Sequence, residues 1–246
     1  MVFNVGTLSV HVANTADESA IQAADDFAAA VADVLKQKNE CNVIFAGGES
    51  QQPFHRRVSQ RTDIAWDKIN AFAVDDFWAP GIPEQYSVGA QLKRDLFPKL
   101  PFKSTHTVNF AAIDPESEAA RYAALLVQYP TDIEVIGIGR SGHLALNEPG
   151  STDFNDPQTV RVVDVHPRSK EQLMSDPNFK ALGYIPEQGI TVTISYLKRC
   201  PRVLLDVPYR LNAELVRDTL LAEISDAVPA TIVRTSPNSL LYPGPG

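Results

Sequence analysis

Cysteine is scarce in this sequence, and the spacing of the few cysteines excludes two classes of protein. The 246 residues contain only Cys41 and Cys200, which lie far apart and outside any short ligand motif. A disulfide-stapled scaffold needs several paired cysteines, and a structural zinc site needs ligands at close spacing. Two isolated cysteines are typical of buried thiols in a reducing compartment. We therefore expect a cytoplasmic protein.

Long apolar runs and basic runs are also missing. No apolar stretch approaches the roughly 20 residues that a membrane helix needs, and residues 1–4 lack the start of a signal peptide. The net charge is −8, and the lysines and arginines form no basic run. A basic patch is the usual footprint of a nucleic-acid-binding protein. We therefore expect neither a membrane nor a nucleic acid as a partner.

The histidines do not form a metal site by their spacing. They stand at positions 11, 55, 106, 143 and 166, and none forms a ligand pair at helical spacing. The sequence also shows no internal repeat and no low-complexity linker, and its 44% hydrophobic content is enough for a sizeable core. We interpret residues 1–246 as a single domain without a bound metal.

Predicted strands and helices alternate along the chain. Apolar and β-branched runs predict strands at 8–12, 42–46, 69–74, 133–138, 160–165, 190–194, 203–206 and 230–233. Apolar spacing and capping residues predict a long helix that opens at 15–18, and helices at about 53–60, 86–96, 115–127, 168–174 and 211–222. This alternation implies parallel βαβ units. The expected fold class is α/β, with a single doubly wound, mostly parallel sheet and helices on both faces.

Four loops that follow predicted strands carry glycine or polar residues. The carboxyl ends of parallel strands meet at one edge of a sheet, where open α/β sheets bind their ligands. We therefore expect these loops to lie together. The first contains Gly47, Gly48, Ser50 and Gln51, the second Asp75 and Asp76, the third Gly139, Gly142, His143 and Glu148, and the fourth Arg210.

The residue types in these loops suggest acid–base chemistry on a small anion. His143 and Glu148 can both move protons and lie five residues apart in or just after a glycine-rich loop. A glycine turn at 47–48 and an arginine at a helix start are groups that bind phosphate. The same residues allow weaker interpretations. The glycines also match a dinucleotide-binding pattern, though no acidic residue clearly fits the ribose position. Asp75 and Asp76 also fit a solvated turn or helix cap, and Arg210 a surface ion pair.

Several segments resemble those of one known family. The run GIGRSGHLALNEPG at 137–150 is similar to the signature of the glucosamine-6-phosphate deaminase/isomerase family, which is related to the 6-phosphogluconolactonases. The lactonases carry a similar Gly-His turn but usually lack the Asn-Glu-Pro that follows it here. Further similar segments are GESQ at 48–51, VDDF at 74–77, PEQYS at 83–87, DFNDP at 153–157 and PATIVR at 229–234.

The resemblance implies a reaction and a role for each candidate residue. The substrate would be glucosamine or galactosamine 6-phosphate, and the reaction an aldose–ketose isomerisation with release of ammonia, which needs no cofactor. Asp75 would move the proton between C2 and C1, His143 would help to open the sugar ring, and Glu148 would tune that histidine. The expected substrate- and phosphate-binding residues are Gly47, Gly48, Ser50, Gln51, Asp76, Gly139, Gly142 and Arg210. The partner is a small sugar phosphate, and assembly into a homo-oligomer is left open.

The sequence departs from the family pattern near the expected site. Ser141 replaces the usual aspartate or asparagine beside the histidine, Arg140 precedes it, and Glu49 places a negative charge in the presumed phosphate loop. Ser236 also stands where a histidine is frequent. Two alternatives stay open. The shared Gly-His turn favours a 6-phosphogluconolactonase-like hydrolase, and the departures at Ser141 and Glu49 favour a non-catalytic protein that binds a sugar phosphate.

Overall fold

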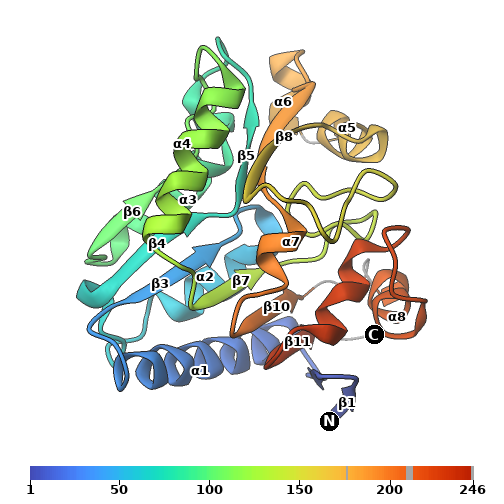
Figure 1. Cartoon of the computed structure of the whole chain (residues 1–246). Helices are drawn as coiled ribbons and strands as arrows, with labels where there is room; N and C mark the ends of the chain where they lie inside the picture. The colour runs from blue at the N-terminus through green and yellow to red at the C-terminus, as the bar shows by residue number, and fades with distance from the viewer. Residues whose placement is uncertain (176, 209–212, 245–246) are drawn as a thin grey trace.

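The structure, a computed structural model, describes residues 1–175, 177–208 and 213–244. Its strands are β1 (Val2–Val5), β2 (Leu8–His11), β3 (Cys41–Phe45), β4 (Ile69–Ala73), β5 (Asp75–Trp78), β6 (Ser104–His106), β7 (Ile133–Ile136), β8 (Val160–Asp164), β9 (Gln188–Val192), β10 (Val203–Val207) and β11 (Ser239–Pro243). They form a large sheet in the order β1-β2-β11-β10-β7-β3-β4-β6 and a small sheet in the order β5-β9-β8 (Figure 1).

Helices connect most of the strands. The α-helices are α1 (Ala16–Leu35), α2 (Gln52–Val58), α3 (Val88–Asp95), α4 (Pro115–Gln128), α5 (Pro167–Ser175), α6 (Pro177–Leu182), α7 (Ile194–Leu197) and α8 (Ala213–Leu221). The 3₁₀ helices are η1 (Glu49–Gln51), η2 (Trp66–Lys68), η3 (Glu84–Tyr86), η4 (Phe97–Lys99) and η6 (Pro229–Thr235).

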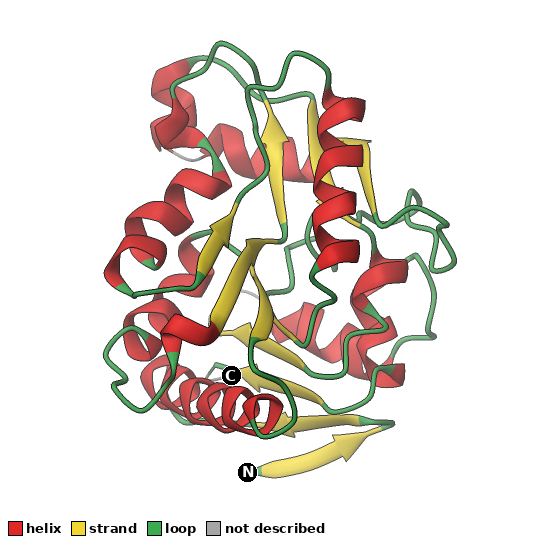
Figure 2. Ribbon diagram, turned by 60° about the vertical axis from the view of Figure 1, so that its left-hand side comes forward, coloured by secondary structure: helices red, strands yellow, loops and turns green. Residues whose placement is uncertain are grey.

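The large sheet is mostly parallel and is covered on both faces. Among its described strands only β1 runs antiparallel to its neighbour. On one face α1 and α2 bury Phe27 and Phe54 against the strands. On the other face α4 and α7 bury Tyr122 and Leu197 in a second core, and Figure 2 shows helices on both sides of the strands. The predicted doubly wound α/β architecture is confirmed.

Two helix starts predicted from capping residues are confirmed. Thr15 accepts a hydrogen bond from the backbone N–H of Glu18 at 3.1 Å, and the Glu18 carboxylate accepts one from the N–H of Asn14 at 2.9 Å. Asp114 accepts from the N–H of Ser117 at 3.0 Å at the start of α4. Such side chains satisfy N–H groups that have no partner inside the helix, which fixes where each helix begins.

The strand predicted at 230–233 is wrong. These residues lie in η6, and the strand at this end of the chain is β11. Pro229, at the start of η6, has no N–H for a strand ladder. The hydroxyl of Thr231 donates to the carbonyl of Val228 at 2.7 Å, which supports a helical turn. A short apolar run of this kind has no periodicity that separates a buried strand from a buried helical turn.

The small sheet also differs from the prediction. Residues 75–81 were expected to be a loop, but Asp75–Trp78 is strand β5, paired antiparallel with β9. The predicted strands at 160–165 and 190–194 exist, yet they pair antiparallel with each other in this sheet. Val74 explains the change of sheet, because its N–H bonds Phe45 in the large sheet while its carbonyl accepts from Val192 in the small one. The chain thus passes from one sheet to the other immediately before Asp75.

Other expectations concern single residues and absences. Cys41 and Cys200 are free and buried, as predicted. The helix predicted at 211–222 is seen as α8, and positions 211 and 212 lie outside the described residues. None of the helices in the described ranges is long and apolar enough to cross a membrane.

A buried carboxyl group lies near the end of a central strand. Asp206 of β10 is 1% exposed, and neither of its side-chain oxygens has a hydrogen-bond partner within the part of the chain that the structure describes. Burial raises the pKa of Asp206 to about 8, because the charged form loses its hydration. The folded protein therefore holds this proton at pH values where the unfolded chain has released it.

We expect this proton to make stability depend on pH. Between the ordinary pKa of 3.8 and the folded value of about 8, the unfolded chain binds fewer protons, so stability falls as pH rises. Between pH 5 and pH 8 the free energy of unfolding should fall by up to about 4 kcal/mol because of Asp206. Asp206→Asn should remove this fall. Urea unfolding at both pH values measures the difference. Asp67→Asn, at an exposed position, should leave the slope unchanged, and an unchanged slope in Asp206→Asn would assign it to another group.

Candidate active site

The parallel sheet brings the predicted loops to one edge. Strands β10, β7, β3 and β4 are parallel neighbours, so the loops that follow them share the carboxyl edge of the sheet. The loops that begin at Gly47 and Gly137 therefore lie together, as predicted, and Asp75 follows β4 at the same edge as the first residue of β5. The prediction for Arg210 falls on residues 209–212, which lie outside the described residues.

The loop after β7 holds an imidazole against a buried carboxylate. The Nδ1 atom of His143 lies 2.9 Å from Oε1 of Glu148, and the side chain of Glu148 is only 2% exposed. The hydroxyl of Ser141 lies 2.8 Å from the same Nδ1 and 2.5 Å from Oε2 of Glu148. A further hydroxyl, from Ser169 of α5, donates to Oε1 of Glu148. The predicted pair of His143 and Glu148 is therefore in contact in the structure.

These contacts fix where the imidazole carries its proton. A carboxylate only accepts hydrogen bonds, so Ser141 donates its single proton to Glu148. The short contacts at Nδ1 of His143 then require an N–H on this atom, shared between Glu148 and the oxygen of Ser141. In the neutral ring the other nitrogen, Nε2, carries a free lone pair. His143 is thus arranged as a base through Nε2.

Glu148 stays charged although it is buried. Burial raises the pKa of this carboxyl, but the hydrogen bond and charge of His143, with the hydroxyls of Ser141 and Ser169, lower it further, to about 2. Hydrogen bonds to the charged form are the reason. The departure of Ser141 from the family pattern suggested that the histidine loses a partner. The structure shows instead that Ser141 keeps the arrangement intact. It supplies a donor where an aspartate would add a second negative charge.

The predicted glycines make room for this arrangement. A Cβ atom at Gly139 would lie 1.8 Å from Nε2 of His143, so only glycine allows the ring to lie there. Gly142 adopts a φ of +85°, a conformation that other residues rarely adopt. The N–H of Gly142 donates to the carbonyl of Gly139, which closes the turn. Both glycines shape the histidine loop, and their contact with a substrate stays a prediction.

Asp75 lies where the two sheets meet. It is the first residue of β5 and is 8% exposed. Burial raises the pKa of Asp75 to about 7, and attraction by protonated His143 opposes that rise. A carboxyl group with such a pKa can both accept and return a proton near neutral pH. The structure therefore places a carboxyl group that titrates near neutral pH within electrostatic reach of the imidazole.

Asp76 has a different place. Its carboxylate is fully buried and accepts hydrogen bonds from the backbone N–H groups of Phe77, Val88 and Gly89, at 2.8, 2.9 and 2.8 Å. Two of these groups lie at the start of α3. This is the helix-cap interpretation that the sequence left open. Its predicted contact with substrate has no support in this geometry.

The loop after β3 begins a helical run. Residues of η1 and α2 follow one another from Glu49 to Val58, and the first N–H groups of such a run have no partner within it. Gly48 adopts a φ of +93° and has open space around its Cα atom. Glu49 is exposed, as expected for a charge that does not enter the loop. The geometry is compatible with a bound anion at Gly47–Ser50.

Gln51 is part of the same loop but is held elsewhere. It is 1% exposed, and its side-chain amide donates to the carbonyl of Asp206 at 3.1 Å. This contact ties the loop after β3 to the end of β10, which is the strand that precedes Arg210. We expect Gln51 to position the two loops relative to each other.

Sequence reasoning missed two contributors to the site. Ser169 lies in α5, 21 residues after Glu148, and no local sequence motif indicates that the two residues are in contact. Asn147 belongs to the family signature, but its side chain donates to the carbonyls of Leu144 and Val192 and accepts from the N–H of Ile194. Asn147 therefore fastens the histidine loop to β9 and α7.

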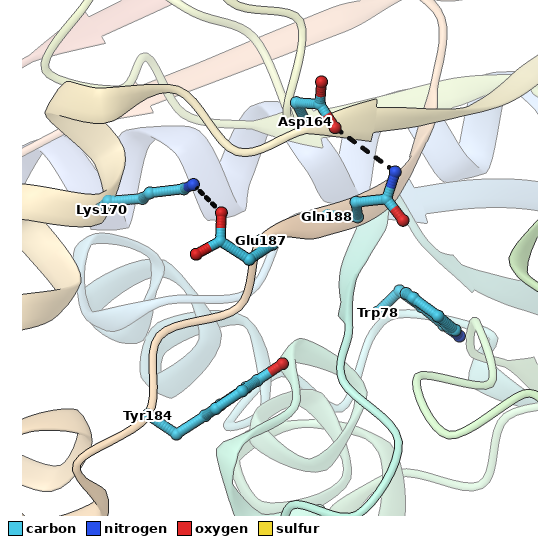
Figure 3. A pocket seen from close by; sticks show the side chains of 6 residues that line it. All are labelled: Trp78, Asp164, Lys170, Tyr184, Glu187 and Gln188. Atoms are coloured by element: carbon cyan, nitrogen blue, oxygen red, sulfur yellow. Dashed lines mark hydrogen bonds and ion pairs between the residues drawn. The ribbon is translucent and has the colours of Figure 1, made fainter.

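A surface hollow of about 400 Å³ lies away from this site (Figure 3). It is lined by Trp78, Asp164, Lys170, Tyr184, Glu187 and Gln188. Trp78 pairs with Gln188 three residues along β5 from Asp75, so the two side chains point to opposite faces of the small sheet. The polar groups of the hollow bond one another, Lys170 with Glu187 and Gln188 with Asp164. It contains no acid–base pair like that of His143.

Known proteins share this fold and much of this sequence. Residues 14–242 match the family model described as glucosamine-6-phosphate isomerases/6-phosphogluconolactonase. Over 208 residues the chain is 28% identical to the glucosamine-6-phosphate deaminase of Bacillus cereus (strain B4264). The aligned residues cover 85% of this chain and 77% of the deaminase.

Solved structures extend the likeness in fold. A monomeric glucosamine-6-phosphate deaminase superposes with a TM-score of 0.82 at 24% identity, over 94% of this chain and 95% of that one. The 6-phosphogluconolactonase of Thermotoga maritima gives a TM-score of 0.77 at 16% identity, over 96% and 99%. The fold is therefore one that sugar-phosphate deaminases and lactonases share. The chain belongs to the family of glucosamine-6-phosphate isomerases and 6-phosphogluconolactonases.

The close approach of His143 to Gly139 gives a direct test of the site geometry. In Gly139→Ala the new Cβ would meet the ring at 1.8 Å, so the imidazole must leave its contact with Glu148. We expect the ¹⁵N signals of the His143 ring to change. Asp67→Ala, at an exposed position, is the control and should leave the ring signals unchanged. An unchanged His143 ring in Gly139→Ala would contradict the described packing.

Proposed function

We propose that this protein is a hexosamine-6-phosphate deaminase/isomerase. The observation that carries the proposal is the contact of His143 with the buried carboxylate of Glu148, at the same sheet edge as Asp75. The pKa of Asp75 is about 7. Family membership supports a sugar phosphate as the substrate. The 28% identity to a glucosamine-6-phosphate deaminase favours release of ammonia. Glucosamine and galactosamine 6-phosphate are both candidates.

The first step opens the sugar ring. Opening a cyclic hexosamine moves a proton from the hydroxyl at C1 to the ring oxygen. His143 suits this transfer because Nε2 has a free lone pair, while Glu148 stabilises the imidazolium that forms when Nε2 takes the proton. The returned proton goes to the ring oxygen, which leaves an open-chain aldehyde.

The second step moves a proton between neighbouring carbons. Asp75 removes the proton from C2, next to the carbonyl at C1, and delivers it to C1, while one proton of the 2-amino group passes to the oxygen on C1. The two transfers leave a hydroxymethyl group at C1 and a ketose imine at C2. Water adds to that carbon, and ammonia leaves. The products are a ketose 6-phosphate and ammonia, and the reaction needs no electron acceptor.

The phosphate would be held at the same edge of the sheet. The loop from Gly47 to Gln51 offers backbone N–H groups at the start of a helical run. Arg210 would add a charge-assisted clamp from the end of β10. Gly139 and Gly142 would approach the sugar through the histidine loop.

A lactonase is the second candidate, favoured by the structural likeness to a 6-phosphogluconolactonase. A lactone hydrolase needs a base for water, and His143 with Glu148 suits that role as well. A non-catalytic sugar-phosphate binder would keep the pocket without turnover. The hydrogen bonds of Ser141 speak against lost function, because they preserve the His143–Glu148 pair. The assembly state is a separate matter, and one similar deaminase is described as monomeric.

Ammonia release tests the function and the role of Asp75 together. We expect the protein to release ammonia from glucosamine or galactosamine 6-phosphate, with kcat/KM rising as pH increases through about 7, because only the ionised Asp75 accepts a proton. Asp75→Asn should lower turnover by about two to four orders of magnitude. Asp164→Asn, an exposed carboxylate on β8, is the matched control and should retain turnover. Hydrolysis of 6-phosphogluconolactone without ammonia release would instead identify the second candidate.

The pair of His143 and Glu148 predicts a change in the pH profile. Glu148 is charged above about pH 2, so Glu148→Gln removes a negative charge beside the imidazole at every working pH. The imidazolium then loses its counter-charge, and we expect turnover to fall at least roughly ten-fold, with a changed acid limb of the profile. Glu187→Gln removes an exposed carboxylate and should leave the profile unchanged. A profile of the same shape and height in Glu148→Gln would show that the two side chains are not coupled.

A further inference from the structure

Ser169 reaches the active-site carboxylate from a distant element. It lies in α5, next to the small sheet, whereas Glu148 lies in the loop after β7 (Figure 1). The side chain of Ser169 is partly buried, and its hydroxyl donates to Oε1 of Glu148. The family signature at 137–150 does not include this residue. Its contact joins α5 to the carboxylate of the His143–Glu148 pair.

Each oxygen of the Glu148 carboxylate has a serine donor. Oε2 accepts from Ser141, and Oε1 accepts from Ser169 and from Nδ1 of His143. Two donors from separate segments fix the plane of the carboxylate. That plane decides whether Oε1 points along the N–H of His143. If the carboxylate turned, Nδ1 would lose its charged acceptor and keep only the hydroxyl oxygen of Ser141, so the proton would be held on Nδ1 less strongly.

We propose that Ser169 is a positioning residue, whose hydroxyl orients the carboxylate of Glu148 and thereby keeps the proton of the neutral His143 ring on Nδ1. The orientation itself follows from the hydrogen bonds. Its consequence for turnover rests on the proposed function. The role belongs to the hydroxyl, since a side chain that only filled space would not direct the carboxylate.

The neighbouring charged groups do not supply the same effect. Lys170 follows Ser169 but pairs with Glu187 at the surface hollow. Arg161 of β8 pairs with Asp156 at 2.9 Å. Asp75 of β5 interacts with His143 through its charge and, within the described residues, forms no hydrogen bond with the side chain of Glu148. Within the described residues, the donors to the Glu148 carboxylate are thus the two serines and the histidine.

The chain offers a matched control. The hydroxyl of Ser151 also bonds Glu148, but it donates to the backbone carbonyl at 3.2 Å and leaves the carboxylate alone. Ser151→Ala therefore removes a serine hydroxyl that bonds the backbone of Glu148, and it leaves the orientation of the Glu148 side chain unchanged. Ser169→Thr keeps a hydroxyl on α5 and serves as the rescue variant.

The first measurement is the ¹⁵N spectrum of the histidine rings at neutral pH, with His143 assigned from its loss in His143→Gln. We expect a single tautomer, protonated at Nδ1, in the parent protein, in Ser151→Ala and in Ser169→Thr. Ser169→Ala should show a mixture of tautomers. This readout needs no substrate, so it remains informative even if the protein releases no ammonia and the proposed function fails.

The second measurement is ammonia release from the hexosamine 6-phosphate. Ser169→Ala should lower kcat roughly ten-fold, while KM stays within about two-fold, because the proposed role of this hydroxyl is to orient Glu148 and not to bind the sugar. An unchanged tautomer together with an unchanged kcat in Ser169→Ala would overturn the proposal. A changed tautomer that Ser169→Thr fails to restore would also overturn it, since that result would assign the effect to the packing of α5.

Discussion

The buried charge of Glu148 is the constraint on which the site depends. A carboxylate that is 2% exposed cannot rely on water, so its charge must be met by hydrogen bonds. The N–H of His143 and the hydroxyls of Ser141 and Ser169 provide them. The protein obtains from this a fixed imidazole with one defined basic nitrogen. Gly139 belongs to the same arrangement, because a larger residue would occupy the space of the ring.

Buried carboxyl groups in this fold differ in pKa, and hydrogen bonds alone do not explain the difference. Burial raises the pKa of Asp75 and Asp206 to about 7 and about 8. Asp76 accepts three backbone hydrogen bonds, yet burial still raises its pKa to about 8. Glu148 contacts the imidazole of His143 directly and also accepts from two serine hydroxyls, and its pKa falls to about 2. The proposed function uses a carboxyl group of each kind.

Much of the fold and part of the site were predictable from local patterns. The alternation of strands and helices gave the parallel sheet, and that sheet implied that Asp75, His143 and the glycine loop share one edge. The small sheet was not predictable in this way, because the pairing of β5 with β9 joins residues more than a hundred positions apart. The contact of Ser169 with Glu148 could not be predicted for the same reason. The role of Ser169 arises from a contact across the fold, and a serine in an amphipathic helix carries no signal of it.

The two sheets contribute different parts of the site. The parallel sheet supplies the histidine loop and the helical run after β3, while the small sheet begins at Asp75 and is fastened to the histidine loop through Asn147. Val74 bonds both sheets, so the position of Asp75 is set by the larger one while its strand belongs to the smaller. A shift of the small sheet would therefore move the carboxyl of Asp75 relative to His143. Because Ser169 lies beyond that sheet on α5, the orientation of Glu148 also depends on how α5 packs. The relative position of Asp75, His143 and Glu148 is thus a property of the junction between the sheets and not of one loop.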